Sequence, residues 1–483
     1  MRSMKLGWFG VASLWFSLTV SDARVSEWRP LGDGQGNSLE ARFEGKKGSD
    51  YLLRRKTDGK LFEVTPDLLS PADRASFDAS ARKLDEELKK LNRSAGHPVF
   101  TGTPFECRPA GEIAKALELR TESESKFSKS WRLYASRVEG YRLFGAMPYS
   151  VALYAGADGN VTSLSVVYAN KGDFGSKAGV GEDHFKGGTD ATAKTLAEAM
   201  KRDESTVAAA LTESLGPGDT QRFGEGKSRR SIQRWDWNGH SLLLSHEEGE
   251  YVSLLIVPID FAEAGGRTAR VKGGDLRDRL RSCVIKETNG DVYLSEIPMV
   301  DQGPKGYCVP ATFERAMRAM GVETDMYLLA MIGESGIGGG TSVEKLLENV
   351  RSIVYRKGRR TRDEKPKELR IREVKRYLDD GVPVMWTMKS VGEYNKAAND
   401  NTAKRRSVTD WAAYAEQIAT DAEITAKLPA PDEAHHICMI VGYNEATNEL
   451  AVSDSWGRSF ERRWVPVSVA NWASSGGLFM ILP

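Results

Sequence analysis

The chain is poor in the residues that build metal sites and disulfide frameworks. Its 483 residues include four cysteines and six histidines, and neither Cys-x-x-Cys nor His-Glu-x-x-His occurs. Zinc chemistry therefore has no support, and we expect no metal and no other cofactor. Cys107 and Cys283 flank the middle of the chain, so a bridge between them and a pair of free buried thiols are both open alternatives.

An excess of charge of either sign is also absent. Lys and Arg number 68 and Asp and Glu number 67, so no global field favours nucleic acid or an anionic membrane as a partner. Beyond the N-terminus, no apolar run approaches the roughly 20 residues of a membrane-spanning helix. We therefore expect no nucleic-acid partner and no stable membrane insertion.

Residues 1–23 have the features of a secretory signal peptide. Arg2 and Lys5 precede an apolar run of about 15 residues, and small residues stand at the positions expected before a cleavage site after Ala23. The run is too short to span a membrane, although an uncleaved anchor is the alternative. We expect the protein to be exported, and so to be secreted or held in the periplasm or cell envelope.

The length implies two to four domains, and residues 24–78 are expected to form the first. They predict short antiparallel strands in a meander, followed by a helix that opens near Pro71. The segment resembles the Sla homology domain, a small Src-homology-three-like β-barrel, at Trp28, Glu40-Ala41-x-Phe43, Asp58-Gly59-Lys60 and Leu69-Ser70-x-x-Asp73. The resemblance implies peptide or cell-wall contact, and a spacer that merely folds is the alternative.

Two further regions separate this unit from the candidate chemistry. Residues 79–99 predict a charged helix and linker, because three leucines recur at helical spacing among Lys, Asp and Glu. Residues 100–275 alternate strand pairs with helices and predict an α+β domain of unknown role. Its histidines, His184, His240 and His246, stand alone in the sequence and are interpreted as structural.

Residues 290–483 contain a loop and a helix that suit a nucleophilic cysteine. A Gly-rich loop delivers Cys308 to the start of a predicted helix, with Pro310 in the first turn and Gly321 at the end. A helix N-terminus favours the thiolate form of a cysteine, which makes Cys308 the candidate nucleophile. Gln302 precedes it in the same loop, where its amide and the backbone N–H of Cys308 could share an oxyanion.

The partner base is expected on a strand far along the chain. Residues 434–443 form an apolar strand that is interrupted by His435 and His436, and the next strand of the hairpin ends at Asp454. Asp454 is then placed to orient the imidazole, and Trp456 to shield that hydrogen bond from water.

These segments resemble the papain-like cysteine peptidases. Three family motifs occur in the family's order, at Gln302 to Cys308, His436 to Tyr443 and Asp454 to Gly457. Asp replaces the family's Asn, as in bacterial bacteriocin-leader peptidases, and Lys305 replaces the first loop cysteine, which indicates a divergent bacterial branch. The resemblance implies a peptide or protein substrate, a cleft between helices and a small sheet, and catalysis by Cys308, His436 and Asp454 with Gln302 as oxyanion donor. The motif register selects His436 over His435.

Several residues near the predicted nucleophile are expected to line the substrate cleft, namely Gly306, Tyr307, Gly339, Gly340 and Trp456. The Gly-rich run 336–342 predicts a substrate-lining loop, although the cap of the next helix is the alternative. The polar insertion Lys389–Glu433 fits either a lid or a solvated excursion.

The sequence thus predicts an α+β, multidomain protein with a small β-barrel, an α+β middle domain and a papain-like peptidase domain. Three alternatives stay open. The same triad could serve an acyltransferase or cell-wall amidase, and the domain could be a catalytically silent binding module. Residues 24–275 could also cover the cleft until they are cut near Gly265 to Arg281, which is rich in Arg.

Overall fold

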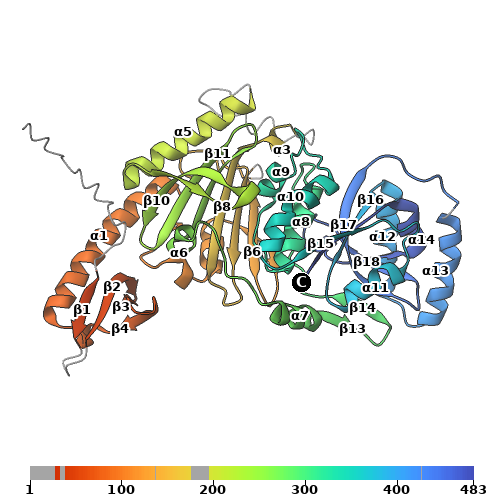
Figure 1. Cartoon of the computed structure of the whole chain (residues 1–483), viewed down its shortest axis with the longest axis horizontal. Helices are drawn as coiled ribbons and strands as arrows, with labels where there is room; N and C mark the ends of the chain where they lie inside the picture. The colour runs from red at the N-terminus through yellow and green to blue at the C-terminus, as the bar shows by residue number, and fades with distance from the viewer. Residues whose placement is uncertain (1–27, 33–37, 136–137, 176–194, 426) are drawn as a thin grey trace, which may run out of the picture.

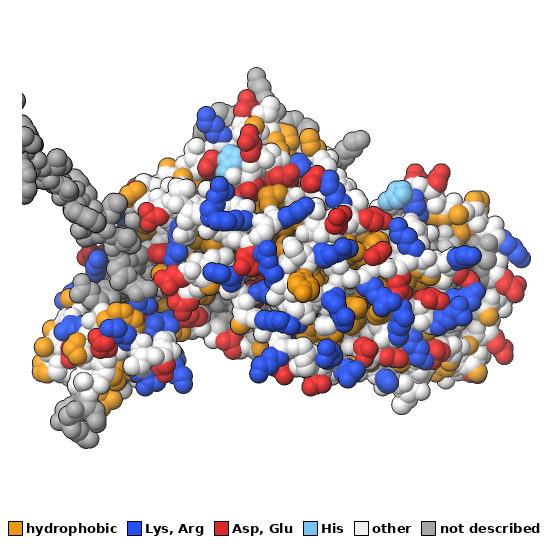
Figure 2. Space-filling model, in the orientation of Figure 1, with side chains coloured by type: hydrophobic (Ala, Val, Ile, Leu, Met, Phe, Trp, Pro, Cys, Tyr) orange, Lys and Arg blue, Asp and Glu red, His pale blue; other side chains and the backbone are white. Residues whose placement is uncertain are grey.

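A computed structural model describes residues 28–32, 38–135, 138–175, 195–425 and 427–483 (Figure 1). The predicted signal peptide and His184 lie outside these ranges. Figure 1 shows a small N-terminal sheet and a C-terminal α/β unit at opposite ends, with a large sheet between them. Within the described ranges, no helix is long and apolar enough to cross a membrane. On the face in Figure 2, Lys and Arg are interspersed with Asp and Glu.

The N-terminal unit is a four-stranded antiparallel meander in the order β1-β2-β3-β4. The strands are β1 Arg29–Gly32, β2 Ser38–Lys47, β3 Asp50–Arg55 and β4 Leu61–Val64. The predicted meander is therefore confirmed. The predicted small β-barrel is not closed within the described residues, because β1 and β4 stay at opposite edges of the sheet and do not pair.

Helix α1, Pro71–Ala95, joins this sheet to the next domain. It begins where the Ser70 side chain accepts a hydrogen bond from the N–H of Asp73, and it ends at Gly96, whose φ of 77° suits glycine. The buried side chains of α1 run along its whole length and include Phe77 near the start and Leu91 near the end. The expected boundary at residue 79 therefore falls inside one continuous helix.

The middle domain is an eight-stranded antiparallel sheet in the order β5-β6-β7-β8-β12-β11-β10-β9. Its strands are β5 Arg120–Glu124, β6 Lys129–Tyr134, β7 Ser150–Ala155, β8 Val161–Asn170, β9 Asp219–Phe223, β10 Arg230–Trp237, β11 His240–Glu247 and β12 Tyr251–Pro258. Helix α5, Leu196–Leu215, packs on β8, β10, β11 and β12. The short helices are α2 Ala110–Ala116, α3 Lys171–Phe174 and α6 Ile259–Glu263. The mixed α and β character expected for this region is confirmed.

The two described histidines of this domain have structural partners. His240 is fully buried with its ring edge-on to Phe105 at 4.4 Å between centroids, and burial lowers its pKa to about 4. His246 pairs with Glu204 through Nδ1 at 2.6 Å. Neither histidine lies beside a candidate nucleophile.

The C-terminal domain is built on a second eight-stranded sheet. Its path is β13-β14-β17-β16-β20-β15, with β18 paired to β17 and β19 to β18. The strands are β13 Val284–Lys286, β14 Asp291–Leu294, β15 Arg360–Glu364, β16 Val384–Lys389, β17 His435–Asn444, β18 Glu449–Ser453, β19 Arg463–Pro466 and β20 Ser474–Leu482. The helices are α7 Gly273–Ser282, α8 Cys308–Ala319, α9 Met326–Ile332, α10 Val343–Arg356, α11 Ile371–Asp379, α12 Gly392–Arg405, α13 Trp411–Thr425 and α14 Val467–Ala473.

This domain begins earlier than the sequence indicated. Leu276 and Leu280 of α7 are buried in its core, and β13 pairs with β14. The structural boundary therefore lies near residue 273, ahead of the expected start at 290. The preceding linker is also tied down, because Lys357 Nζ donates to the carbonyl of Thr268 at 2.8 Å.

The insertion Lys389–Glu433 is packed and is not a solvated excursion. Its helix α12 lies against β19 and buries Tyr394, Ala398, Asn401 and Arg405. Burial of one face fixes the position of this helix beside the sheet that carries the candidate site. Of the two alternatives for Cys107 and Cys283, the structure has the free thiols and no bridge, and all four cysteines are free.

Candidate active site

Cys308 is the first residue of α8, at the end of the loop that contains Gln302 and Lys305. The helix is packed into the domain by its inner face, where Phe313 and Met317 are fully buried. Proline is tolerated at position 310 since the first N–H groups of a helix have no intrahelical partner. The thiol of Cys308 is therefore held at the positive end of a packed helix.

His436 lies on β17 and connects Cys308 to Asp454. Its interaction with the Cys308 side chain helps to raise the pKa of the imidazole, and its Nε2 lies 2.9 Å from Oδ1 of Asp454. The ring of Trp456 stacks on the imidazole, with centroids 4.8 Å apart and planes inclined by 29°. The imidazole side chain is only 7% exposed. These contacts fix the ring in one orientation between the thiol and the carboxylate.

His435, the neighbouring candidate, points elsewhere. It is exposed, and its Nε2 lies 2.8 Å from Lys389 Nζ. Successive residues of a strand face opposite sides, so only one of the two histidines can face Cys308. The structure thus brings together Cys308, His436 and Asp454 and leaves His435 outside the group.

Arg463 is a member of the site that the sequence analysis missed. Its Nη2 donates to Oδ2 of Asp454 at 2.6 Å, so each oxygen of the carboxylate has its own partner. Its Nη1 donates to Asn395 and Asn399 of α12, at 3.1 and 3.0 Å. The insertion therefore supports the site. The sequence feature that could have indicated this role is the position of Arg463 directly before the apolar run Trp464-Val465-Pro466.

The electrostatics of the group favour an imidazolium. Burial opposes the charge on His436, but the hydrogen bond with Asp454 and the contact with Cys308 raise its pKa to about 9. Burial also opposes the charge on Asp454, yet His436 and Arg463 lower the pKa of its carboxyl group. The arrangement therefore stabilises a protonated His436 beside the Asp454 carboxylate.

Gln302 is held in the loop before Cys308 by hydrogen bonds of its main chain and its side chain. Its backbone N–H donates to the carbonyl of Ser455 at 2.9 Å, which ties the loop to the segment after Asp454. Its side-chain Nε2 donates to the carbonyl of Lys305 at 3.1 Å. An amide nitrogen carries two hydrogens, so one hydrogen stays available for an oxyanion next to the N–H of Cys308.

The predicted glycines form a pair of adjacent loops next to Cys308. Gly306 and Gly339 make a parallel bridge, and the N–H of Gly340 donates to the carbonyl of Gly306 at 3.0 Å. A Cβ on Gly339 would lie 2.4 Å from the Cα of Gly306, so only glycine permits this approach. The alternative role of the run, as the cap of the next helix, is also realised, since its last residue, Ser342, caps α10.

Tyr307 departs from its expected role. Its side chain is 2% exposed and packs edge-on against Tyr327 at 5.8 Å between centroids. A Cβ on Gly172 of the middle domain would lie 2.3 Å from the ring. The ring therefore faces the domain junction, and its burial is incompatible with substrate contact through the side chain.

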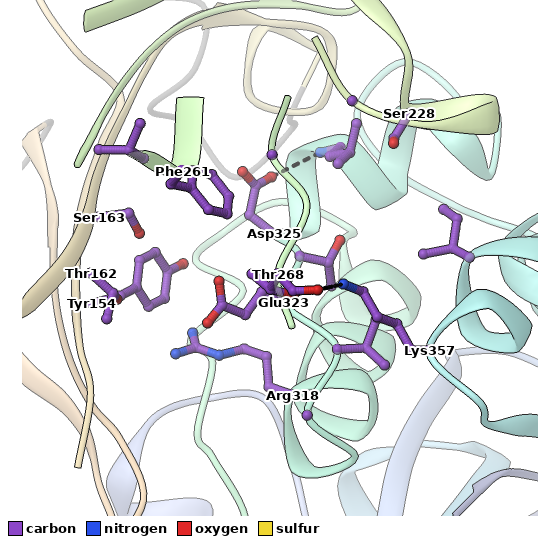
Figure 3. Close-up of a pocket in the computed structure, with 18 of the residues that line it drawn as sticks. Tyr154, Thr162, Ser163, Ser228, Phe261, Thr268, Arg318, Glu323, Asp325 and Lys357 are labelled. Atoms are coloured by element: carbon purple, nitrogen blue, oxygen red, sulfur yellow. Dashed lines mark hydrogen bonds between the residues drawn. The ribbon is translucent and has the colours of Figure 1, made fainter. Parts of the chain in front are cut away.

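A separate cavity of about 380 Å³ lies between the middle sheet and the far end of α8 (Figure 3). Tyr154 and Phe261 line one side, and Arg318, Glu323 and Lys357 line the other. Neither Cys308 nor His436 contributes to its wall. The cavity is thus distinct from the candidate active site.

The arrangement of a helix-borne cysteine, a strand-borne histidine and a buried carboxylate resembles that of the papain-like cysteine peptidases. A comparison with family models agrees, because residues 294–478 match the Peptidase_C39 like family. The match supports a papain-like cysteine peptidase domain at the C-terminus, with a cysteine-peptidase type of function and a peptide or protein substrate. It does not extend to residues 24–78, whose likeness to the Sla homology domain stays a prediction. No curated protein matches the chain.

Proposed function

We propose that the protein is an exported cysteine peptidase that hydrolyses peptide bonds with Cys308 as nucleophile. The observation that carries this proposal is the continuous contact from the Cys308 thiol through His436 to Asp454. Export rests on the signal-peptide pattern of residues 1–23, which places the protein outside the cytoplasm or in the cell envelope. Residues 24–78 are proposed to contact peptide or cell wall.

The proposed reaction begins with attack of the Cys308 thiolate on a peptide carbonyl carbon. The carbonyl oxygen becomes an oxyanion, which accepts hydrogen bonds from Gln302 and from the N–H of Cys308. The tetrahedral intermediate then collapses, the C–N bond breaks, and the His436 imidazolium gives its Nδ1 proton to the leaving amine. Neutral His436 next takes a proton from water, which attacks the thioester and releases the acid.

The substrate is proposed to lie along the bridged glycines Gly306, Gly339 and Gly340. Their close backbones leave no side chains in the way, so an extended peptide could approach the thiol from this side. Trp456 covers the bond between His436 and Asp454 and so keeps water from competing for it. Tyr307 is not included in this set.

The first test is labelling of the mature protein with an epoxysuccinyl thiol-protease probe, followed by intact mass. One adduct is expected on the wild type and on Cys107→Ala, a control at a half-buried thiol outside the site, and none on Cys308→Ala. A library of unstructured peptides then identifies cleaved bonds. Absence of any adduct on the wild type would favour a silent binding module. An adduct with acyl transfer to added amines, but no peptide cleavage, would favour the transferase reading.

The pH dependence of hydrolysis is expected to report on His436. Because its pKa is raised to about 9, the alkaline limb of kcat/KM should fall near that pH. Asp454→Asn removes the negative partner, so we expect the limb to move down by about one to three pH units. The raised pKa also contributes stability that is complete below the unfolded value of about 6.5 and is lost as pH rises through about 9. A pH profile with an unmoved alkaline limb in Asp454→Asn would contradict this assignment.

A further inference from the structure

The middle domain holds the loop that carries Gln302. The Ser123 hydroxyl accepts a hydrogen bond from the N–H of Met299 at 3.0 Å, and Glu122 accepts one from the N–H of Asp301 at 2.8 Å. Tyr134 contacts the same loop, because its hydroxyl donates a hydrogen bond to the carbonyl of Asp301 at 2.5 Å. These contacts come from β5 and β6, so the backbone just ahead of Gln302 is attached to the neighbouring domain.

The strongest attachment is Lys305, whose side chain is fully enclosed. Its Nζ lies 3.3 Å from Oδ1 of Asp173, which is equally buried at the start of α3. Four tyrosine rings surround the ammonium, with centroids at 4.7, 5.0, 5.5 and 4.9 Å for Tyr134, Tyr149, Tyr307 and Tyr327. A carboxylate and aromatic faces are the groups that best replace water around an ammonium. Asp173 and two of the rings belong to the middle domain.

This enclosure acts on the candidate oxyanion site through the main chain. The carbonyl of Lys305 accepts the Nε2 hydrogen of Gln302, so the residue anchored by its side chain also orients the amide with its backbone. Burying an ion pair stabilises a protein poorly compared with apolar packing. A buried pair at this place is better explained by the precise position it gives to the loop.

The domain junction also contains the cavity at the far end of α8. Figure 3 shows Tyr154 and Arg318 side by side at this cavity, and the Arg318 guanidinium carbon lies 4.2 Å from the centroid of the Tyr154 ring. The junction is therefore bridged at residues 299–307 and again beside the cavity, where the Tyr154 hydroxyl also donates to Glu314 Oε1 at 3.2 Å. Specific contacts to the loop, and not general burial, are what link the domains at the active site.

We propose that Lys305 is a positioning residue for Gln302, and that the middle domain is a working part of the active site. Asp173, Tyr134 and Tyr149 hold the Lys305 ammonium, and the Lys305 carbonyl holds the oxyanion donor. The inference rests on the proposed peptidase function. It opposes the alternative in which residues 24–275 are an inhibitory segment, because their removal would release the loop that the chemistry needs.

The test compares two reactions of Cys308 in the full mature chain. Alkylation by iodoacetamide is a displacement at a CH₂ group and forms no oxyanion, whereas acylation by p-nitrophenyl acetate passes through one. Lys305→Met removes the charge and keeps the length of the side chain. We expect alkylation to stay within about twofold and acylation to fall by about 10²-fold, the usual effect of losing one oxyanion donor.

A double-substitution cycle separates positioning from a merely structural role. Gln302→Ala should give the same selective loss of acylation, and adding Lys305→Met to it should cause little further loss. Asp173→Asn, which keeps the shape of its side chain, should reproduce the effect in part. Lys357→Met is the matched control, because Lys357 lines the cavity at the same junction. We expect it to leave both rates unchanged.

Additive losses in the cycle, or normal acylation by Lys305→Met, would overturn the proposal. Failure of the proposed function would appear differently, as a wild-type Cys308 that reacts with neither reagent. Amide hydrogen exchange then tests the positioning role without relying on a reaction of Cys308. Exchange in residues 301–307 should be faster in Lys305→Met than in the wild type, with α5 unchanged, and equal exchange in the loop would refute the positioning role.

Discussion

His436→Ala is expected to reduce the kcat for peptide hydrolysis by about 10⁴-fold to 10⁶-fold. The change removes the group that stabilises the thiolate and that protonates the leaving amine. It also leaves Oδ1 of Asp454 without its partner at 2.9 Å. The measurement is kcat and KM on a peptide from the library, with circular dichroism to show that the variant is folded.

His435→Ala is the matched control, since it deletes the same ring from the adjacent residue of β17. His435 is exposed and contacts Lys389, so kcat should change by less than about twofold. A large loss in His435→Ala with little loss in His436→Ala would show that the wrong histidine had been assigned. Equal loss in both would indicate that the strand itself had been disturbed.

The parts of the fold that the sequence predicted are those set by local patterns. Strands β7, β8, β10, β11 and β12 of the middle sheet could be located because apolar alternation and Asn-Gly and Asp-Gly turns mark them directly, whereas β5, β6 and β9 were not predicted. The helix after Cys308 could be recognised from Pro310, Gly321 and the spacing of Phe313 and Met317. These signals lie within about a dozen residues of each other, so they need no knowledge of distant contacts.

The support of the candidate site depends on distant contacts and was therefore missed. Lys305 meets Asp173 across 132 positions of the chain, and the sequence alone presented it only as a departure from the family's loop cysteine. Arg463 reaches Asp454 only because β19 pairs with β18. Tyr307 was expected in the cleft because it precedes Cys308, but the middle domain draws its ring to the other side.

Closure of the N-terminal sheet and burial of the insertion Lys389–Glu433 were still harder to predict from the sequence. A meander of short strands is compatible with a closed barrel or an open sheet, and the choice depends on whether the first and last strands pair. The polar composition of the insertion was compatible with a lid or with a solvated excursion. Polar residues in α12 are buried all the same, since their partners are charged or amide groups on β14, β18 and β19.

Arg405→Met is expected to destabilise the C-terminal domain by about 3–5 kcal/mol, because it leaves two buried carboxylates without their cation. Arg405 bonds to Glu449 of β18 and to Asp291 of β14, and the side chains of the three residues are 5%, 0% and 9% exposed. Its guanidinium also lies 4.1 Å from the centroid of the Trp464 ring. For a domain of this size, the loss corresponds to a fall in Tm on the order of 10 °C, which differential scanning calorimetry would resolve.

Lys404→Met is the control for this change, since it removes the neighbouring cation from the same helix. Lys404 is 58% exposed and lies 3.6 Å from a partly exposed Asp421, so its ion pair should contribute little. Equal Tm values for Arg405→Met and wild type would show that α12 is not anchored by this pair.

Helix α12 also holds Arg463 through Asn395 and Asn399, so loosening the helix should weaken the contact of Arg463 with Asp454. We therefore expect Arg405→Met to lower the hydrolysis rate at temperatures where the rest of the domain is still folded, whereas Lys404→Met should not.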